Sequence, residues 1–316
     1  MTNHRPLLHS AGRWELIRML GAICDTPEVA VVAARYLDLG ELKSSAHTQV
    51  FVMNAPPYAA IHLGGEGQLG GDAADRVGGF WRALGLVPPV QPDHLSALLA
   101  LYAHLGEAGD DATKPDTRSA LTRMRHALIW EHLWSWIPGY AQAITDLDVP
   151  ILSPWAVVLR EVLAAELDDG IGGLETVLPA ALRDAPSPLS TSDNLSDLLD
   201  GLIAPIRCGI VITRQTLAKA TGDVGVGHRI GERRFTLRAM LEQDTTATLR
   251  WLATETRRWH DLRIDPGSSL KLDGALAWWA ERSAQVAGAL AVLAKGSAPD
   301  RPEAFGSIRV DSGVGT

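Results

Sequence analysis

The sequence predicts an all-α protein, and three observations lead to this expectation. Apolar residues recur at helical spacing along most of the 316 residues. Two segments pair a capping hydroxyl with a proline, as the first turns of helices often do. β-Branched runs occur only at 50–52 and 206–213, and neither has a partner run at hairpin distance. We therefore expect a helical bundle without a sheet.

The first two expected helices lie before residue 40. Thr26 and Pro27 give the second of them a cap and a first-turn proline, and it runs to about Leu39, where Gly40 is a suitable stop. Residues 54–79 are rich in Gly and Pro and predict a long loop with one short helix; such loops are usually functional or mobile. The first helix has one apolar face, made by Trp14, Ile17, Leu20 and Cys24.

The next helices follow from apolar stripes and prolines. An apolar stripe at positions 95, 98, 99, 102 and 105 predicts a helix that breaks between Asp110 and Pro115. A longer helix is expected from about Thr117, and Pro138 should end or kink it. Ser153 and Pro154 open another helix, which runs to about residue 167.

A polar Pro/Ser segment divides the chain into two parts. We expect a helical domain at residues 1–182, a linker at 183–194 and a C-terminal helical extension at 195–295. The extension includes an Ala-rich helix from Leu270 to Leu293, whose two tryptophans should pack onto the body because its polar face lacks a basic excess. Residues 296–316 show no periodicity and are expected to be disordered.

Composition and charge narrow the function classes. A hydrophobic fraction of 46% with 21% charged residues fits a soluble globular protein, and a net charge of −8 argues against general affinity for nucleic acid. The start lacks a signal-peptide pattern, and no apolar run is long enough for a membrane span. Cys24 and Cys208 lack metal-ligand spacing, so two packed thiols in a reducing cytoplasm are expected. We expect no metal site.

Three segments carry the functional signal: Pro56-Pro57-Tyr58, Gln91-Pro92-Asp93-His94-Leu95 and His132-Leu133-Trp134-Ser135-Trp136. Asp93 suits the N-cap of the helix that Leu95 begins, which would leave His94 partly exposed in the first turn. Pro56-Pro57-Tyr58 offers a stiff, extended backbone for a peptide, although an ordinary turn explains it equally well. Trp130 and Trp134 are expected in the core, and Trp136 at the wall of a groove.

The order of these three segments, over about the first 180 residues, resembles the TorD/DmsD/NarJ family of molybdoenzyme maturation chaperones. The resemblance implies a TorD-like helical bundle, here with an additional C-terminal helical extension. It also implies a cytoplasmic chaperone rather than an enzyme. Such a chaperone binds the immature catalytic subunit of a molybdopterin-dependent oxidoreductase, or its leader peptide, before cofactor insertion and export.

The resemblance assigns client or peptide binding to six residues: Tyr58, Pro92, Asp93, His94, His132 and Trp136. Family members commonly have Glu before the Pro-Asp-His turn and acids along the next helix, where this chain has Gln91, Leu98 and Ala100. A twin-arginine leader would therefore need other carboxylates, for which Glu66, Asp72 and Asp75 are candidates.

The chain itself is expected to hold no cofactor. Contact with a guanine nucleotide or molybdopterin guanine dinucleotide follows from the resemblance only, and monomer and homodimer both remain open. Gly225 to Gly231 superficially matches a phosphate-binding fingerprint but follows no expected strand, so it does not indicate dinucleotide binding.

Two alternative functions come from the residues themselves. Residues 207–263 hold 11 Lys/Arg against six Asp/Glu, a net charge of +5 that leaves −13 for the rest. Residues 213–241 could therefore form a helix-turn-helix of a DNA-binding transcription regulator, with Arg233, Arg234 and Arg238 on the second helix. The simpler interpretation is that Glu232, Arg233 and Arg234 form ion pairs with the acidic first part. The other alternative is an enzyme that uses Asp93 and His94 as an acid–base pair.

Overall fold

The computed structural model describes residues 10–168, 177–265 and 273–297. Within them every regular element is a helix, which confirms the all-α prediction, and the β pairing is one isolated antiparallel bridge between Tyr58 and His94. The elements up to residue 168 are α1 (Ser10–Ala22), α2 (Pro27–Tyr36), α3 (Ser44–His47), η1 (Thr48–Asn54), α4 (Ala59–Leu63), α5 (Gly71–Ala83), α6 (Leu95–Asp111), α7 (Pro115–Ala127), η2 (Leu128–Trp134), α8 (Ile137–Asp146) and α9 (Leu152–Asp168). Those after it are α10 (Ala180–Arg183), α11 (Leu195–Ile203), α12 (Pro205–Cys208), α13 (Arg214–Val224), α14 (Arg233–Gln243), α15 (Thr245–Ile264) and α16 (Gly274–Gly296).

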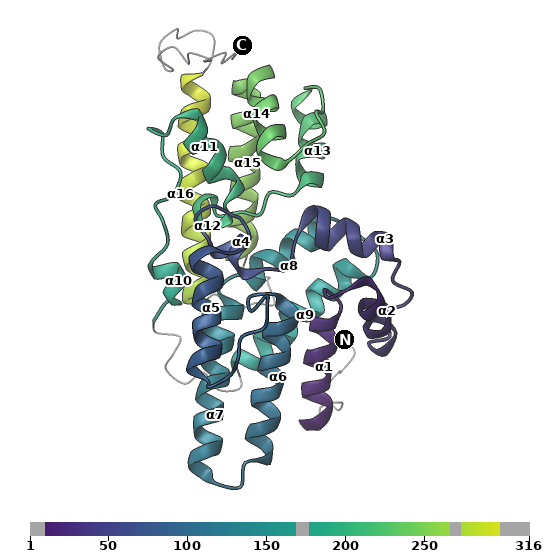
Figure 1. Cartoon of the computed structure of the whole chain (residues 1–316). Helices are drawn as coiled ribbons and strands as arrows, with labels where there is room; N and C mark the ends of the chain where they lie inside the picture. Colours follow the sequence, from purple (N-terminus) through teal and green to yellow (C-terminus); the bar gives the residue numbers. More distant parts are fainter. Residues whose placement is uncertain (1–9, 169–176, 266–272, 298–316) are drawn as a thin grey trace, which may run out of the picture.

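The first hydrophobic core is built around the pair α1 and α6, which lie side by side (Figure 1). The two helices approach closely because Gly106 has no side chain: a Cβ there would clash with the indole of Trp14. From the other side Trp155 of α9 closes the core, and its indole nitrogen donates a hydrogen bond to the carbonyl oxygen of Leu20 over 3.0 Å. The stripe that predicted α6 is therefore its buried face.

Residues 54–79 contain more helix than the long loop with one short helix that we expected. They contain α4 and most of α5, and all five side chains of α4 are buried. The glycine pair at 78–79 lies inside α5, where Gly78 is buried beside Pro92. Glycine lowers helix propensity by only about 1 kcal/mol per residue, so burial of one helix face can override it. Composition alone therefore misassigned this region.

The long helix expected from Thr117 begins two residues earlier, at Pro115, and changes character near its end. α7 passes directly into η2, a π-helical stretch, and the helix ends at Trp134. Pro138 lies in the first turn of α8, where its missing amide hydrogen costs nothing. The long helix was expected to end or kink at Pro138; it ends four residues earlier, and the proline belongs to the next helix.

The second hydrophobic core is formed mainly by α11 and α13–α16. α15 and α16, green and yellow in Figure 1, run side by side along the length of this part. The first turns of α16 reach the first core, where Trp279 is buried and its indole nitrogen donates to the carbonyl oxygen of Ser135 over 2.8 Å. The expected packing of this helix onto the body is confirmed.

Several predictions made from sequence concern the connections. Leu189, within the expected linker, is buried in the second core. Pro186 accepts a hydrogen bond from Arg282 of α16 over 2.8 Å, so this part of the segment lies along the body. Residues 298–316 of the expected tail lie outside the described residues, as do residues 270–272 of the Ala-rich helix.

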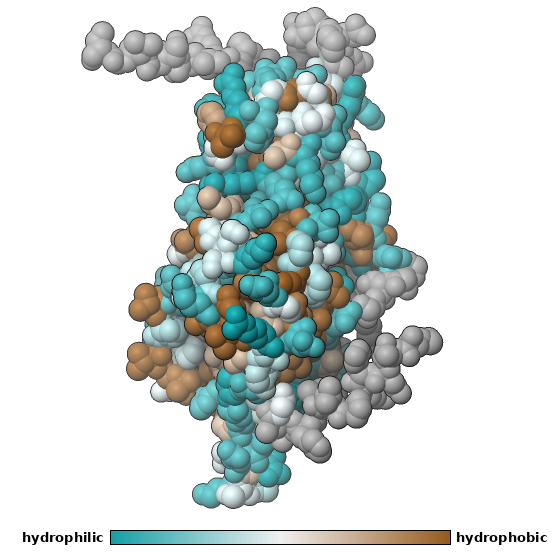
Figure 2. Space-filling model, turned by 90° about the vertical axis from the view of Figure 1, so that its right-hand side faces the viewer, coloured by the Kyte–Doolittle hydropathy of each residue, from teal (hydrophilic) through white to brown (hydrophobic). Residues whose placement is uncertain are grey.

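The thiols of Cys24 and Cys208 are free and buried, as expected. Among the described helices, none combines the length and the apolar character that a bilayer crossing requires. Apolar surface nevertheless remains: Figure 2 shows hydrophobic residues gathered over the middle of one face. The exposed apolar side chains of α2 and η1 include Val29, Val32, Val52 and Met53.

Candidate functional site

The turn before α6 is hydrogen-bonded to the start of α4, so the first turns of the two helices are held together. Asp93 is 4% exposed, and its Oδ2 accepts a hydrogen bond from the backbone amide of Ala60 in the first turn of α4 over 3.0 Å. Two backbone bonds flank it, from Ala59 to the carbonyl oxygen of Asp93 (3.1 Å) and from Leu95 to that of Pro57 (2.9 Å). Asp93 therefore caps α4 instead of α6, which corrects our expectation. Capping across the fold depends on a contact that local sequence does not encode.

His94, not Asp93, is the N-cap of α6. Its Nδ1 accepts from the backbone amide of Ser96 over 3.2 Å, so the ring proton of the neutral imidazole is assigned to Nε2. The ring lies edge-on to that of Tyr58, with centroids 4.8 Å apart, and burial lowers the pKa of His94 below its usual value. The hydroxyl of Tyr58 donates to Oε1 of Gln91 over 3.0 Å.

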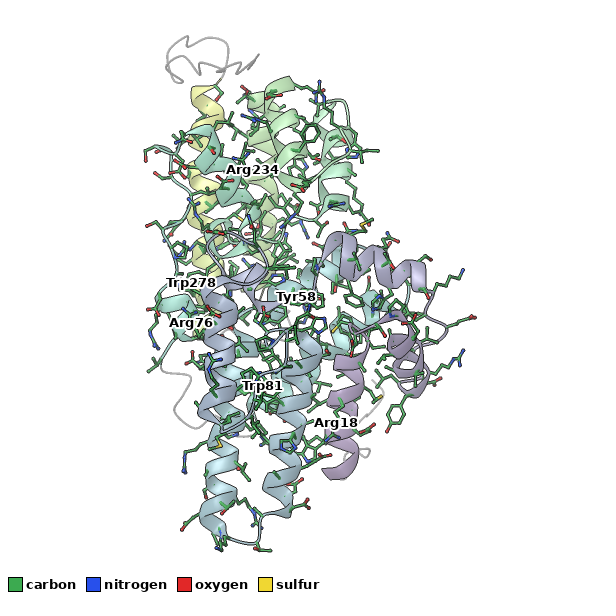
Figure 3. All side chains as sticks on the ribbon, viewed as in Figure 1. Arg18, Tyr58, Arg76, Trp81, Arg234 and Trp278 are labelled. Carbon is green, nitrogen blue, oxygen red and sulfur yellow. The ribbon has the colours of Figure 1, made fainter. Side chains whose placement is uncertain are left out.

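Asp93 and His94 point to different partners and do not form an acid–base pair. The carboxylate is engaged by Ala60, while the imidazole faces Tyr58 and Ser96. Trp81 supports the turn from α5, because its indole nitrogen donates to the carbonyl oxygen of Pro92 over 3.3 Å. Figure 3 labels Tyr58 and Trp81 around this turn. The arrangement gives the enzyme alternative no support.

The third segment lies beneath α4 instead of beside the turn. Trp136 is 1% exposed and stacks on His62 of α4, with ring centroids 4.9 Å apart and an interplanar angle of 20°. Its indole nitrogen donates to the carbonyl oxygen of His132 over 2.8 Å. Trp136 is thus a buried support and not the groove wall that we expected. Trp130 and Trp134 are core residues, as expected.

Two histidines of this buried layer are held neutral. Burial lowers the pKa of His132 to about 4 and that of His62 to about 3. His132 packs against Phe80 of α5, with ring centroids 4.8 Å apart. His62 was absent from our sequence prediction, because a lone histidine in a Gly/Pro-rich stretch carries no signal of its own. α4 thus connects the three sequence segments: its start meets Asp93, and its end rests on Trp136.

Beside α4 the surface opens into a cleft of about 450 Å³. One wall is the connection from α4 to α5, and the other is α10 with the segment that follows it. Three carboxylates line it, from Glu66, Asp72 and Asp184, with Arg76 as the one lining cation among the described residues. Asp75, another carboxylate expected to meet a leader, is exposed but does not line it. Asp184 and Arg76 were not predicted.

One glycine fixes the cleft against the second part of the chain. Gly67 adopts φ +62°, and a Cβ there would clash with the carbonyl oxygen of Ile203 at the end of α11. Its amide also donates to the carbonyl oxygen of Gly64 over 3.1 Å, closing the turn. The cleft therefore takes its shape from both parts of the chain.

The basic segment of the second part is engaged internally. Arg233 donates to the carbonyl oxygen of Ile212 over 3.1 Å, and Arg234 pairs with Asp200 over 2.6 Å. The expected ion pairs from Arg234 to the first part are therefore wrong, because its partner belongs to α11. An ion pair with the first part is instead made by Arg258, which pairs with Asp146 of α8 over 2.5 Å.

The arrangement offers binding surfaces more than reactive groups. No cluster of three or more His, Cys, Asp or Glu side chains that could hold a metal occurs in the described part of the chain. Neither the curated proteins nor the solved structures contained a match to this chain. A family model does match: residues 30–142, a little over a third of the chain, are similar to the nitrate reductase delta subunit family. This range includes all six residues predicted to bind a client, together with Glu66, Asp72 and Arg76.

Proposed function

We propose that this protein is a cytoplasmic chaperone for the immature catalytic subunit of a molybdopterin-dependent oxidoreductase. The observation that carries the proposal is the match of residues 30–142 to the nitrate reductase delta subunit family, a family of molybdoenzyme maturation chaperones. The role is binding without turnover. The chain carries no cofactor of its own in this proposal, because the molybdopterin belongs to the client.

The acidic cleft beside α4 is the proposed client site. Its volume of about 450 Å³ suits a short extended segment with a few side chains, and its three carboxylates favour a cationic one. Arginine pairs with carboxylates in a bidentate geometry, so a twin-arginine leader is the proposed ligand. Glu66 and Asp72 thereby replace the acids that this chain lacks at Gln91, Leu98 and Ala100.

The turn at Tyr58, Pro92 and His94 has a supporting place in this proposal. Tyr58 and His94 are partly exposed at one end of α4, and the cleft begins at the other end. Asp93, His132 and Trp136 are buried and act through α4, whose position they fix. Release requires the mature client to bind less tightly than the immature one, which follows if cofactor insertion buries the recognised segment.

The first experiment is affinity purification of the tagged full-length chain from its native cytoplasm, with mass spectrometry of the proteins that co-purify. We expect one molybdoenzyme catalytic subunit, enriched when cofactor synthesis is blocked. Recovery of nucleic acid, or of no such subunit while the oxidoreductase is being made, would overturn the proposal.

A second experiment tests the cleft itself. The triple variant Glu66→Gln, Asp72→Asn and Asp184→Asn removes its negative charge, and we expect client affinity to fall at least about tenfold. The matched control is Asp75→Asn, which removes an exposed carboxylate of α5 outside the cleft and should leave affinity unchanged. Equal losses in both variants would mean that general charge, and not the cleft, attracts the client.

A further inference from the structure

A second cavity, of about 40 Å³, lies at the junction of the two hydrophobic cores. The first part contributes residues of α8 and α9 to its walls, and the second part contributes residues of α15 and α16. Its apolar walls are Pro138, Trp259, Leu262, Leu276 and Trp279. A water molecule needs about 10–15 Å³ by the same measure, so this space accommodates one small polyatomic group.

Two guanidinium groups line this cavity, and no carboxylate among the described residues lines it with them. Arg160 and Arg263 line it, and none of the described lining residues is acidic. The nearby acid Asp146 is engaged by Arg258 and by the side-chain amide of Gln142. Arg160 and Arg263 make no ion pair with any described residue. Both arginine side chains are partly buried and have no counter-charge among the described residues, which makes the site receptive to an anion.

The hydrogen bonds of Arg263 show which of its nitrogens remain available. Nη1 points inward and donates to the carbonyl oxygens of Gly209 (2.7 Å) and Trp279 (3.0 Å), and to the hydroxyl of Ser283. No described residue accepts a hydrogen bond from Nη2, which approaches Gly139: a Cβ on that glycine would lie 3.7 Å from it. The rings of Trp259 and Trp279 hold the guanidinium at 5.2 and 5.6 Å from their centroids. One edge of Arg263 is thus anchored, and the other makes no hydrogen bond with a described residue.

Two further donor groups belong to residues that line the same space. Nε of Arg160 is buried and has no hydrogen-bond partner in the described part of the chain. Gly139 lies in the first turn of α8, which no side chain caps. Helix N-termini favour negative charge, so the amide of Gly139 adds to the two arginines.

We propose that this junction cavity is a binding site for a phosphate-sized oxyanion, held by Arg160, Arg263 and the first turn of α8. Because its ligands come from both parts of the chain, the bound anion joins the two cores. Free inorganic phosphate and a phosphate group on a larger molecule share this chemistry. The cavity's volume admits only the phosphate group itself and leaves any attached group in solvent.

The test is a titration of the full-length protein with inorganic phosphate at constant ionic strength, followed by tryptophan fluorescence and calorimetry. Trp259 and Trp279 form the walls, so we expect a saturable fluorescence change with phosphate and none with equimolar chloride. Titrations with phosphoserine and adenosine monophosphate then separate the two sources. Tighter binding of either ester would identify a phosphorylated molecule, and tighter binding of phosphate would identify the free ion.

The variants separate this site from general charge effects. Arg160→Gln removes an unpartnered donor, and we expect phosphate affinity to fall about tenfold or more. Arg257→Gln, on the exposed face of α15, removes the same charge outside the cavity and should bind phosphate normally. Arg263→Gln also loses three internal hydrogen bonds, so its phosphate affinity is informative only if the variant folds. Absence of saturable phosphate binding to the wild type, or unchanged affinity in Arg160→Gln, would overturn the proposal.

Discussion

The turn at residues 91–95 and the junction cavity differ in whether their polar groups have hydrogen-bond partners within the protein. In the turn, the Asp93 carboxylate and Nδ1 of His94 each accept a hydrogen bond from a backbone amide. Arg160, which lines the cavity, has a buried Nε with no hydrogen-bond partner among the described residues. A motif that stands out in the sequence is thus satisfied within the fold, whereas donors that no motif marks remain open. Unsatisfied buried groups indicate a ligand more directly than prominent ones.

The largest effect should come from the buried support of α4. Trp136→Ala removes a fully buried indole, and we expect the free energy of unfolding to fall by about 3–5 kcal/mol in urea denaturation. Trp251→Ala, which changes a partly exposed indole of α15, serves as the control and should cost less. A small loss in Trp136→Ala with impaired client binding would restore this residue to the client site.

Asp93→Ala tests whether the turn is structural. The variant leaves the amide of Ala60 buried without an acceptor, and we expect a loss of about 1–3 kcal/mol in the free energy of unfolding. Asp93→Asn keeps an acceptor oxygen and should lose less. His94→Ala removes a cap on α6 and should cost about 1 kcal/mol. If Asp93→Ala were as stable as the wild type but bound client poorly, the carboxylate would be a ligand and not a clamp.

The buried histidines predict how stability depends on pH. The folded-state pKa values of His132 (about 4) and His62 (about 3) lie below the unfolded value of about 6.5. The unfolded chain therefore binds more protons between these values, and stability falls as the pH falls from 7 towards 4. Each histidine should contribute a loss of about 2 kcal/mol between pH 7 and pH 5. His132→Gln should reduce that slope in urea titrations at both pH values, and an unchanged slope would contradict the assignment.

Arg234→Ala tests the basic segment and should have a smaller effect. Its ion pair with Asp200 is partly exposed on both sides, so we expect a loss of less than about 1 kcal/mol in the free energy of unfolding. Fluorescence anisotropy with duplex DNA should detect no salt-sensitive binding by the wild type. Binding that disappears in Arg234→Ala would revive the transcription-regulator alternative.

The smallest effect on the free energy of unfolding is expected at the junction cavity, whose open donors distinguish it from the turn. Arg160 has no hydrogen bond or ion pair with a described residue to lose, so Arg160→Gln in phosphate-free buffer should change the free energy of unfolding by less than about 0.5 kcal/mol. With phosphate at 100 times its Kd, the wild type should gain about 2.7 kcal/mol and the variant much less. A large loss without phosphate would show that Arg160 has a structural partner.

The sequence predicted the helical class and most helix starts, because apolar spacing and prolines act locally. α2, α6 and α9 follow from such signals. α4 and α5 did not, because their glycines are compensated by burial that only the tertiary structure supplies. Residue spacing also could not show that Asp93 reaches Ala60, or that Trp136 lies beneath His62.

The candidate sites were predictable to different degrees. Glu66 and Asp72 were named from their charge alone, and both line the cleft. Asp184 joins them from α10, far away in the sequence, and no local pattern links these positions. The junction cavity was not predictable, since Arg160 and Arg263 lie on separate helices within ordinary helical patterns.

The contact of Gly67 with the end of α11 has a consequence for protein synthesis. The turn that shapes the acidic cleft packs against the backbone at Ile203, which is synthesised after all the described residues that line the cleft. A nascent chain that has folded only its first part therefore lacks the surface against which this turn is set. If the cleft is the client site, as we propose, recognition requires the second part of the chain, and a ribosome-bound fragment that ends before α11 would not capture a client.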